Sequence, residues 1–335
     1  MGLSDNYTQQ GQNMIKKTSK LLLGAALALS AISAGAAETT LKAVSAFSKD
    51  TFYNERFEAF VEKVNAEGKG ILQINVVGGP ESIPTFEVGN AVRSGVVDFA
   101  NTSAVFHANL VPEALAMTLT DRRMDELREN GGYDLLNQIH TDKSNMIWLA
   151  RVTDGVQYHL YLNKPIEEAN LKGFKIRSTP VYLALLRNLG ASALQISPGE
   201  TYTALERGVV DGYGWPSVGL LDLGWQEKTK YRVEPGFYNV EVSFFINQDS
   251  WNKLNDEQKA FLQKQVEWVE SLNEAELVRA EEEKKRQEEA GVEVLQLSDA
   301  VAEDLLNRAY TAGWENIHRV SPQNAADIEK LFGRN

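Results

Sequence analysis

The chain has 335 residues, of which 43% are hydrophobic and 24% charged, a composition typical of soluble globular proteins. This length favours two domains over a single core. A formal net charge of −12 argues against nucleic acid and anionic lipid as partners, and the lack of cysteine excludes disulfides, thiolate metal sites and cysteine nucleophiles.

Residues 1–36 have the pattern of a secretory signal peptide. Three lysines precede an apolar run over residues 21–32, and residues 34–36, AGA, fit the small-x-small cleavage rule. The alternative is a membrane anchor, but this run of about 12 residues falls short of the roughly 20 needed to span a bilayer. We therefore expect cleavage after Ala36 and a soluble, monomeric protein in the periplasm.

Strands alternate with helices in the first part of the chain that follows. The first helix is well marked, because Phe57, Phe60 and Val64 recur at three- to four-residue spacing. The expected elements are a strand at 41–47, a helix at 51–67, a strand at 71–77, a helix at 85–94 and a strand at 96–100. This alternation predicts an α/β fold with largely parallel sheets.

One short pattern occurs twice. Residues 91–98 and 204–211 both read A-x-x-x-G-V-V-D, which we interpret as a helix end, a glycine cap and a short buried strand. Eight positions leave coincidence open, but each copy follows a strand–turn–helix block. The repeat therefore indicates two lobes of the same α/β type.

A long helix is expected near the end of the chain. Apolar residues recur from Asn255 onwards, and the pattern continues to about Ala290, where Gly291 ends it. A helix of that length either crosses between lobes or breaks partway. The charged run at 281–289 is interpreted as a solvated face, with partner binding as the alternative.

No motif of a known catalytic class is present. The four histidines are scattered, and the chain has no H-E-x-x-H, no G-x-S-x-G and no phosphate-binding G-x-x-x-x-G-K-[ST]. Residues 212–214 read G-x-G, but the third glycine of a dinucleotide loop is missing. Abundant acidic residues leave a carboxylate pair open, although no pair stands out. A binding protein is favoured over an enzyme.

The stretch 171–180, LKGFKIRSTP, predicts a glycine turn and a short strand with Arg177 at its end. That arginine is either a surface charge or a clamp for an anion. Together with residues 189–191, LGA, and 201–212, TYTALERGVVDG, this segment resembles the solute-binding proteins of tripartite ATP-independent periplasmic (TRAP) transporters, of the dicarboxylate-binding type. The signal peptide, residues 95–99 and residues 247–254 fit the same family.

The resemblance implies two α/β lobes, joined by crossing strands and a long helix, that close over a ligand. It also implies delivery of that ligand to TRAP membrane permease subunits. We expect residues 38–153 with 242–285 to form the first lobe, and residues 154–241 with 286–330 to form the second. Two rival functions stay open: an exported enzyme that acts on a small carboxylate, and a ligand-loaded accessory of a membrane sensor.

Within this family the arginine of the K-I-R block binds the carboxylate of the ligand, a role that falls on Arg177. Guanidinium offers a planar fork that matches a carboxylate. Relatives place a ligand contact at Trp215 and a second polar contact, often arginine, at Gln157. Because this chain has glutamine there, the resemblance favours a monocarboxylate (a 2-oxo, hydroxy or aromatic acid) over a dicarboxylate.

The remaining expectations for the site are weaker. Some relatives that bind 2-oxo acids hold a metal with an acid just before the tryptophan; here that residue is Gly214, so we expect neither a metal ion nor a cofactor. Strand ends face the cleft in α/β lobes, which makes Phe47, Ser48 and Ser103 candidate contacts in the first lobe. Tyr213 is a further candidate, with core packing as its alternative.

Overall fold

The computed structural model describes residues 37–334. The signal peptide and its cleavage point therefore lie outside the described residues and stay a prediction. Residues 39–334 belong to one compact unit, and the fold and the site are described within it. Between residues 37 and 334, no helix is both long enough and apolar enough to cross a bilayer.

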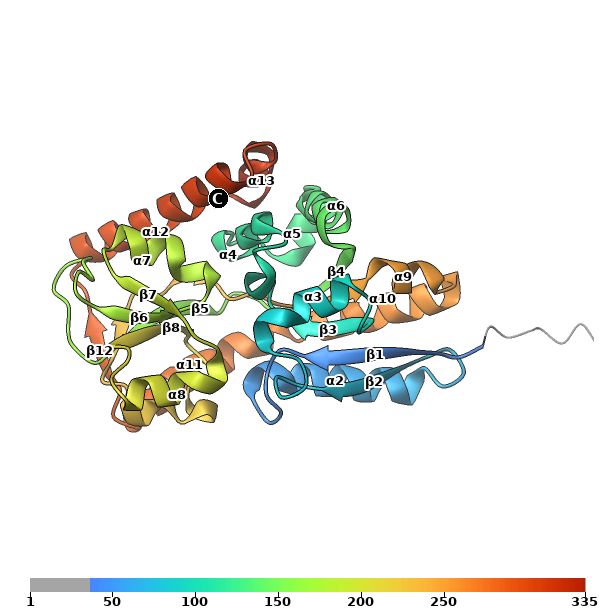
Figure 1. Ribbon diagram of the computed structural model, residues 1–335, viewed down its shortest axis with the longest axis horizontal. Helices are drawn as coiled ribbons and strands as arrows, with labels where there is room; N and C mark the ends of the chain where they lie inside the picture. Colours follow the sequence, from blue (N-terminus) through green and yellow to red (C-terminus); the bar gives the residue numbers. More distant parts are fainter. Residues whose placement is uncertain (1–36, 335) are drawn as a thin grey trace, which may run out of the picture. The chain divides into compact units, whose positions relative to one another are not determined.

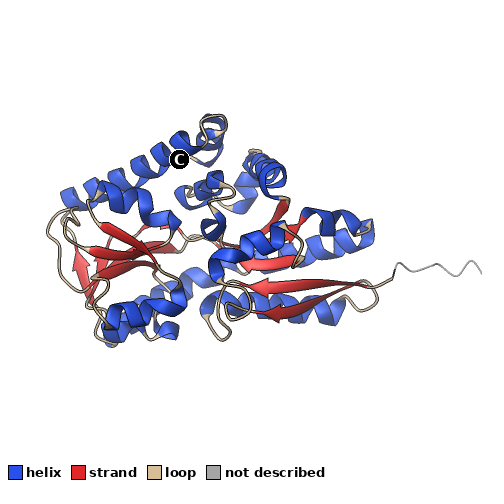
Figure 2. Ribbon diagram, viewed as in Figure 1, coloured by secondary structure: helices blue, strands red, loops and turns tan. Residues whose placement is uncertain are grey.

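The strands gather into two separate sheets (Figures 1 and 2). The first sheet, which defines the first lobe, has five strands in the order β2-β1-β3-β11-β4. Their bounds are Thr39–Ser45 for β1, Leu72–Gly78 for β2, Phe99–Thr102 for β3, Met146–Thr153 for β4 and Val242–Asn247 for β11. Its helix α2 (Phe52–Glu67) stacks Phe57 and Phe60 on Phe99, with ring centroids 6.3 and 5.8 Å apart.

The second sheet, which defines the second lobe, has seven strands. Six follow the order β12-β9-β5-β8-β6-β7, and β10 pairs with β5 outside that path. Their bounds are Gln157–Leu162 for β5, Lys175–Ser178 for β6, Ser192–Gln195 for β7, Gly212–Pro216 for β8, Tyr231–Glu234 for β9, Phe237–Asn239 for β10 and Glu293–Gln296 for β12. Helix α7 (Leu183–Asn188) packs against β7, and α8 is Pro198–Glu206.

The α/β prediction is confirmed, but the sheets are mixed and not largely parallel. In the first sheet β1 pairs in parallel with β2 and β3, whereas β11 runs antiparallel to β3 and β4. In the second sheet β5 runs antiparallel to β8, β9 and β10. Each antiparallel pair includes β5 or β11. The chain enters these two strands as it crosses between the lobes, from β4 into β5 and from β10 into β11.

The repeated A-x-x-x-G-V-V-D pattern forms the same structure in each lobe. Gly95 and Gly208 both have positive φ, of 72° and 64°, as expected of glycine caps. The aspartate that ends each copy makes an equivalent hydrogen bond to a strand. Asp98 accepts from the backbone N–H of Lys42 at 2.8 Å, and Asp211 accepts from that of Lys175 at 2.9 Å. The repeat is thus structural in origin.

Two boundaries differ from expectation around the first copy. The helix at 85–94 is a 3₁₀ turn at Thr85–Glu87 followed by α3 (Val88–Arg93), and the strand begins at Phe99 instead of Val96. Val96 is 60% exposed. Both valines lie in the turn that brings Asp98 beside β1, where Val96 faces solvent and Val97 packs into the core.

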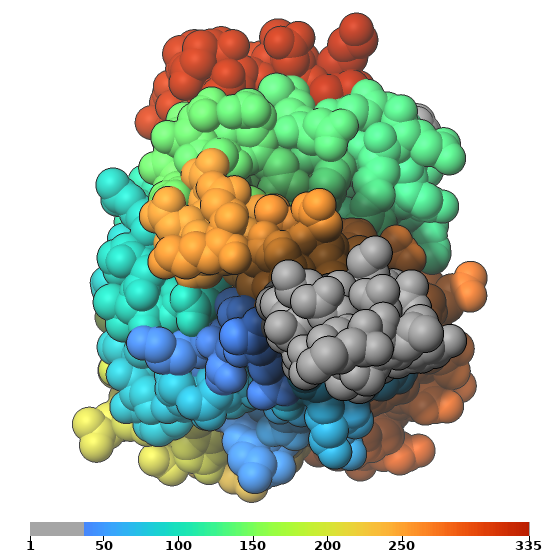
Figure 3. Space-filling view, turned by 90° about the vertical axis from the view of Figure 1, so that its right-hand side faces the viewer, coloured from blue at the N-terminus to red at the C-terminus, as the bar shows by residue number. Residues whose placement is uncertain are grey.

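The expected long helix is broken. Helix α10 runs over Asp256–Glu270 and α11 over Asn273–Glu289, separated by Ser271 and Leu272. Helix α10, with α9 (Gln248–Lys253) before it, belongs to the first lobe and packs on β4 and α2. In Figure 3 the orange surface of this segment lies between green and blue-to-cyan surfaces from the first half of the chain.

The last two helices also link the lobes. Helix α12 (Asp299–Val320) packs on α7 and on α4 (Ala116–Leu119), and α13 (Ala325–Phe332) packs on α4 and α6 (Gly132–Ser144), with α5 at Met124–Glu129 nearby. Ser321 and Asn324 donate hydrogen bonds to buried Glu113. These residues, expected in the second lobe, therefore contact the first.

Candidate functional site

Two adjacent hollows lie where the lobes meet. The outer cleft has a volume of about 630 Å³ and the inner cavity about 30 Å³. Phe47, Tyr53 and Trp215 line both of them. Their rings follow one another, with centroids 5.4 Å apart for Phe47 and Tyr53 and 5.9 Å apart for Tyr53 and Trp215. An aromatic partition thus separates the cavity from the cleft.

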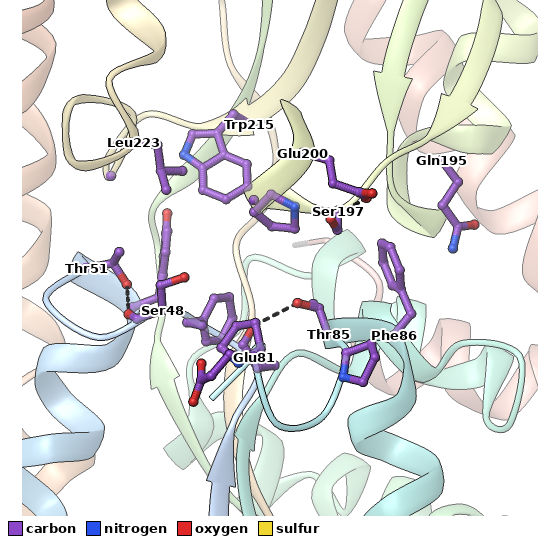
Figure 4. Close-up of a pocket in the computed structure, with 18 residues that line it drawn as sticks. Ser48, Thr51, Glu81, Thr85, Phe86, Gln195, Ser197, Glu200, Trp215 and Leu223 are labelled. Atoms are coloured by element: carbon purple, nitrogen blue, oxygen red, sulfur yellow. Dashed lines mark hydrogen bonds between the residues drawn. The ribbon is translucent and has the colours of Figure 1, made fainter. Parts of the chain in front are cut away.

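The outer cleft is lined from both lobes (Figure 4). Ser48, Glu81 and Thr85 lie on the first-lobe side, and Ser197 and Glu200 face them from the second. The Ser197 hydroxyl donates to Glu200 at 2.6 Å. Among the described residues that line it, this mouth carries acidic side chains and no basic one, so the positive charge needed to hold an anion must lie deeper.

Arg177 supplies that charge in the inner cavity. It is the third residue of β6 and is fully buried. Its Nε donates to the carbonyl of Ile196 at 2.9 Å and its Nη1 to the carbonyl of Gly214 at 3.2 Å, which fixes the guanidinium plane. Burial lowers the pKa of Arg177 to about 10. The group therefore stays charged at neutral pH.

Three buried donors on the cavity wall lack a protein partner. Within residues 37–334, Arg177 Nη2, the Tyr182 hydroxyl and Trp215 Nε1 make no hydrogen bond, and all three side chains line the cavity. An unsatisfied buried polar group costs about 1–3 kcal/mol, so such groups are seldom left without a role. Together they form a set of donors suited to a carboxylate.

Trp215 and Trp225 also flank the arginine. The Arg177 guanidinium carbon lies 5.5 Å from the Trp215 ring centroid and 5.7 Å from that of Trp225. Indole faces attract a cation, which helps to offset the cost of burying it without a full counter-charge. The tryptophans thus hold the guanidinium ready for an anion.

Glu241, which immediately precedes β11, is a cavity residue that sequence reasoning missed. It is fully buried, and its Oε2 accepts from the Ser103 hydroxyl and from the Ala104 N–H, both at 2.8 Å. Burial raises the pKa of Glu241, while Ser243, Ser103 and the Ala104 N–H act to lower it. The one signal in the sequence is an acid at the start of an apolar strand.

The structure brings together some of the expected site residues and not others. Arg177, Trp215, Phe47 and Ser103 line the inner cavity, and Ser48 lines the outer cleft. Neither hollow is lined by the last two candidates. Gln157 is exposed on β5, and Tyr213 is buried, stacked on Tyr161 and hydrogen-bonded to Thr229.

Gly214 has a steric reason to be glycine. A Cβ at this position would lie 2.5 Å from ring atoms of Tyr182, much closer than real contacts allow. An acidic side chain therefore has no room there while Tyr182 keeps its place. Over residues 37–334, no group of three or more His, Cys, Asp or Glu side chains is arranged to hold a metal ion.

The family model described as bacterial extracellular solute-binding protein, family 7 (DctP) matches residues 43–316. A monocarboxylate 2-oxoacid-binding periplasmic protein of Nostoc sp. is 26% identical over 213 residues, which cover 60% of this chain and 57% of that protein. A solute-binding protein of Roseobacter denitrificans is 25% identical over 258 residues, covering 74% and 78% of the two chains.

Solved structures share the fold. An extracytoplasmic solute receptor of Bordetella pertussis that binds pyroglutamic acid superposes with a TM-score of 0.78, at 16% identity, and covers 88% of this chain and 99% of that one. A two-lobe α/β fold is thereby confirmed.

Proposed function

Because the chain belongs to bacterial extracellular solute-binding protein family 7, we propose that it is the extracytoplasmic receptor of a TRAP transporter. It binds a small organic carboxylate between its lobes and passes it to the membrane permease subunits. Family membership confirms the resemblance drawn from residues 171–212, and with it the expectation of a binding protein instead of an enzyme. Residues 1–36 would direct the protein to the periplasm.

The main support for the proposal is the guanidinium nitrogen Nη2 of Arg177, which is unpaired among the described residues. Two of its nitrogens are committed to backbone carbonyls, and within the described chain its buried Nη2 has no partner. A ligand carboxylate would accept from Nη2 and from the neighbouring donors of Tyr182 and Trp215. Exclusion of water from the cavity strengthens such charged hydrogen bonds.

The composition of the cavity wall favours a monocarboxylate. Among the described residues lining it, Arg177 is the single cation. A second carboxylate would enter without a second counter-charge and would face Glu241, at a high desolvation cost. The relative from Nostoc sp. is named for monocarboxylate 2-oxoacids and the receptor of Bordetella pertussis for pyroglutamic acid, which agrees with one carboxylate per ligand.

Replacement of Arg177 tests the proposal. We expect R177M and R177K to weaken binding of the best-binding carboxylate about 10- to 100-fold, because a buried charge-assisted hydrogen bond is lost or misplaced. Titration calorimetry, after a thermal-shift screen of carboxylates, measures this loss. Lysine keeps the charge, so R177K separates the fork geometry from charge alone.

The matched control is R232M. Arg232 is almost as deeply buried, on β9 of the same sheet, but it is paired with Glu234 and Glu288, both at 2.9 Å, and lines neither hollow. The R232M substitution should lower the melting temperature and leave the affinity for the carboxylate unchanged. Full affinity in R177M and R177K, or the absence of any carboxylate ligand, would contradict the proposed function.

A further inference from the structure

The inner cavity contains an acceptor as well as donors. Glu241 Oε1 is buried and makes no hydrogen bond to any residue between 37 and 334, although its side chain lines the same cavity as Arg177. A carboxylate on the wall of a binding cavity repels the carboxylate of a ligand. Glu241 therefore suits a ligand that carries a hydrogen-bond donor in addition to its carboxylate.

Glu241 is held in place by the first lobe. Its other oxygen, Oε2, accepts from the Ser103 hydroxyl and the Ala104 N–H, and Ser103 itself also accepts from the Val105 N–H at 3.2 Å. These contacts fix the carboxyl plane and commit the Ser103 hydroxyl to the protein. Ser103 is then a positioning residue for Glu241 and does not read the ligand with that hydroxyl.

Arg177 and Glu241 line the same small cavity. A cavity of about 30 Å³ holds roughly two or three water-sized groups, at about 10–15 Å³ each. When a ligand carboxylate binds Arg177 in so small a cavity, the neighbouring carbon of the ligand also contacts the lining residues. The substituent on that carbon meets Glu241.

We propose that Glu241 is the specificity-determining residue of this site, and that the ligand is a small carboxylic acid with a hydrogen-bond donor, N–H or O–H, on the carbon next to its carboxylate. This inference rests on the proposed function and narrows its ligand class. A 2-oxo acid offers only a carbonyl oxygen there, which faces the lone pairs of Oε1. An ammonium group also adds a positive charge beside Glu241, in addition to that of buried Arg151, whereas a hydroxyl or a neutral ring N–H supplies the hydrogen bond alone.

Matched triples of acids test the inference on the mature protein. Pyruvate, lactate and alanine differ only at the second carbon, which carries a carbonyl, a hydroxyl or an ammonium group. The same comparison is made with 2-oxobutyrate, 2-hydroxybutyrate and 2-aminobutyrate, and with phenylpyruvate, phenyllactate and phenylalanine. We expect the donor-bearing members to bind at least about tenfold more tightly than the oxo acid in the best-binding triple.

The variant E241Q should remove that preference. Glutamine keeps the shape but offers an N–H₂ group as well as a carbonyl, so it can donate to an oxo group. We expect the ratio of affinities for the donor-bearing acid and the oxo acid to fall about tenfold. E113Q is the control: Glu113 is an equally buried glutamate, bound to Asn324 at 2.9 Å and outside both hollows, so it should alter stability and leave the ratio unchanged.

The outcomes separate the two proposals. An oxo acid that binds as tightly as its donor-bearing partners, or more tightly, with binding lost in R177M, overturns the assignment of Glu241 and leaves the carboxylate receptor standing. An unchanged ratio in E241Q does the same. If no acid in any triple binds while another carboxylate from the screen, without a donor next to its carboxylate, binds in an Arg177-dependent manner, only the assignment of Glu241 fails. If no carboxylate at all binds in that manner, both proposals fail.

Discussion

At the scale of single residues, the site is marked by polar atoms that are costly to leave alone. The hydroxyl of Tyr182 is fully buried and has no hydrogen-bond partner in the described chain. Burial and nearby Tyr158 raise its pKa, so the hydroxyl stays protonated and able to donate. Such an arrangement destabilises the empty protein and is repaid when a ligand accepts the hydrogen bond.

We predict that Y182F weakens binding of the carboxylate ligand about two- to tenfold, because one neutral hydrogen bond is lost. The melting temperature of the empty protein should stay the same or rise, since the substitution removes only an unsatisfied hydroxyl. Calorimetric titration and a thermal melt of the empty protein measure the two effects, which have opposite signs.

Tyr161 provides the contrast for this substitution. Its hydroxyl is just as buried but donates to the carbonyl of Pro216 at 3.1 Å and to Gln287 at 3.3 Å. Y161F should lower the melting temperature and leave affinity intact. A clear loss of stability in Y182F with unchanged binding would show that its hydroxyl serves the fold and not the ligand.

Residue patterns in the sequence predicted only some of the residues of this site. Arg177 was predicted as a ligand contact because it lies near the end of a strand within a family-specific block, and its burial and free nitrogen agree with that role. Tyr182 carries no local signal of its role, and the only local signal at Glu241 is an acid before an apolar strand. Glu241 meets its partner Ser103 across 138 positions of sequence, and such contacts arise only when the two crossing strands bring the lobes together.

At the scale of elements, the break between α10 and α11 depends on a residue far away in sequence. Arg56 of α2 donates to Asn273 at 2.6 Å, to the Val152 carbonyl at 3.0 Å and to the Leu272 carbonyl, and pairs with Glu276 at 2.8 Å. Asn273 donates to the Arg151 carbonyl at 3.0 Å. Periodicity therefore predicted the helical stretch, and could not place its break.

The same cluster predicts a pH dependence of stability. Burial raises the pKa of Glu276 from 4.5 to about 7, against the opposing effect of Arg56. A group whose pKa is raised in the folded state adds stability below its unfolded pKa, and this contribution is lost as the pH rises through the folded value. As the pH rises from 5 to 8, the wild type should lose this contribution and E276Q should not. The free energy of unfolding of E276Q, relative to that of the wild type, should therefore rise by up to about 3 kcal/mol.

Urea denaturation at several pH values between 5 and 8 measures this difference. The control is E62Q, on Glu62, an exposed acid of α2. Its stability curve should run parallel to that of the wild type. Parallel curves for E276Q as well would mean that Glu276 does not titrate in this range.

At the scale of the molecule, the lobes are joined by two strand crossings, the α10–α11 pair and α12. The sequence predicted this plan through the repeat at 91–98 and 204–211, since each copy ties a glycine-capped helix to the neighbouring strand in the same way. It could not predict how the lobes meet, because closure contacts join residues about 170 positions apart with no local pattern.

One such contact makes closure testable apart from ligand chemistry. The backbone N–H of Phe52, at the start of α2 in the first lobe, donates to the Asp222 carboxylate of the second lobe at 2.9 Å, and the Tyr53 hydroxyl donates to the Val218 carbonyl at 3.0 Å. A carboxylate at a helix N-terminus is favourable, so Asp222 stabilises this contact between the lobes. It lines neither hollow.

We predict that D222A weakens binding about two- to fivefold, because ligand must then supply more of the free energy of closure. The factor should be the same for every acid in the matched triples, whereas E241Q changes their order. Spin labels on the two lobes should report a longer mean interlobe distance in D222A without ligand and the wild-type distance at saturation. E303A, an exposed acid on α12, is the control. A loss of affinity confined to one class of acid would place Asp222 in ligand recognition and not in closure.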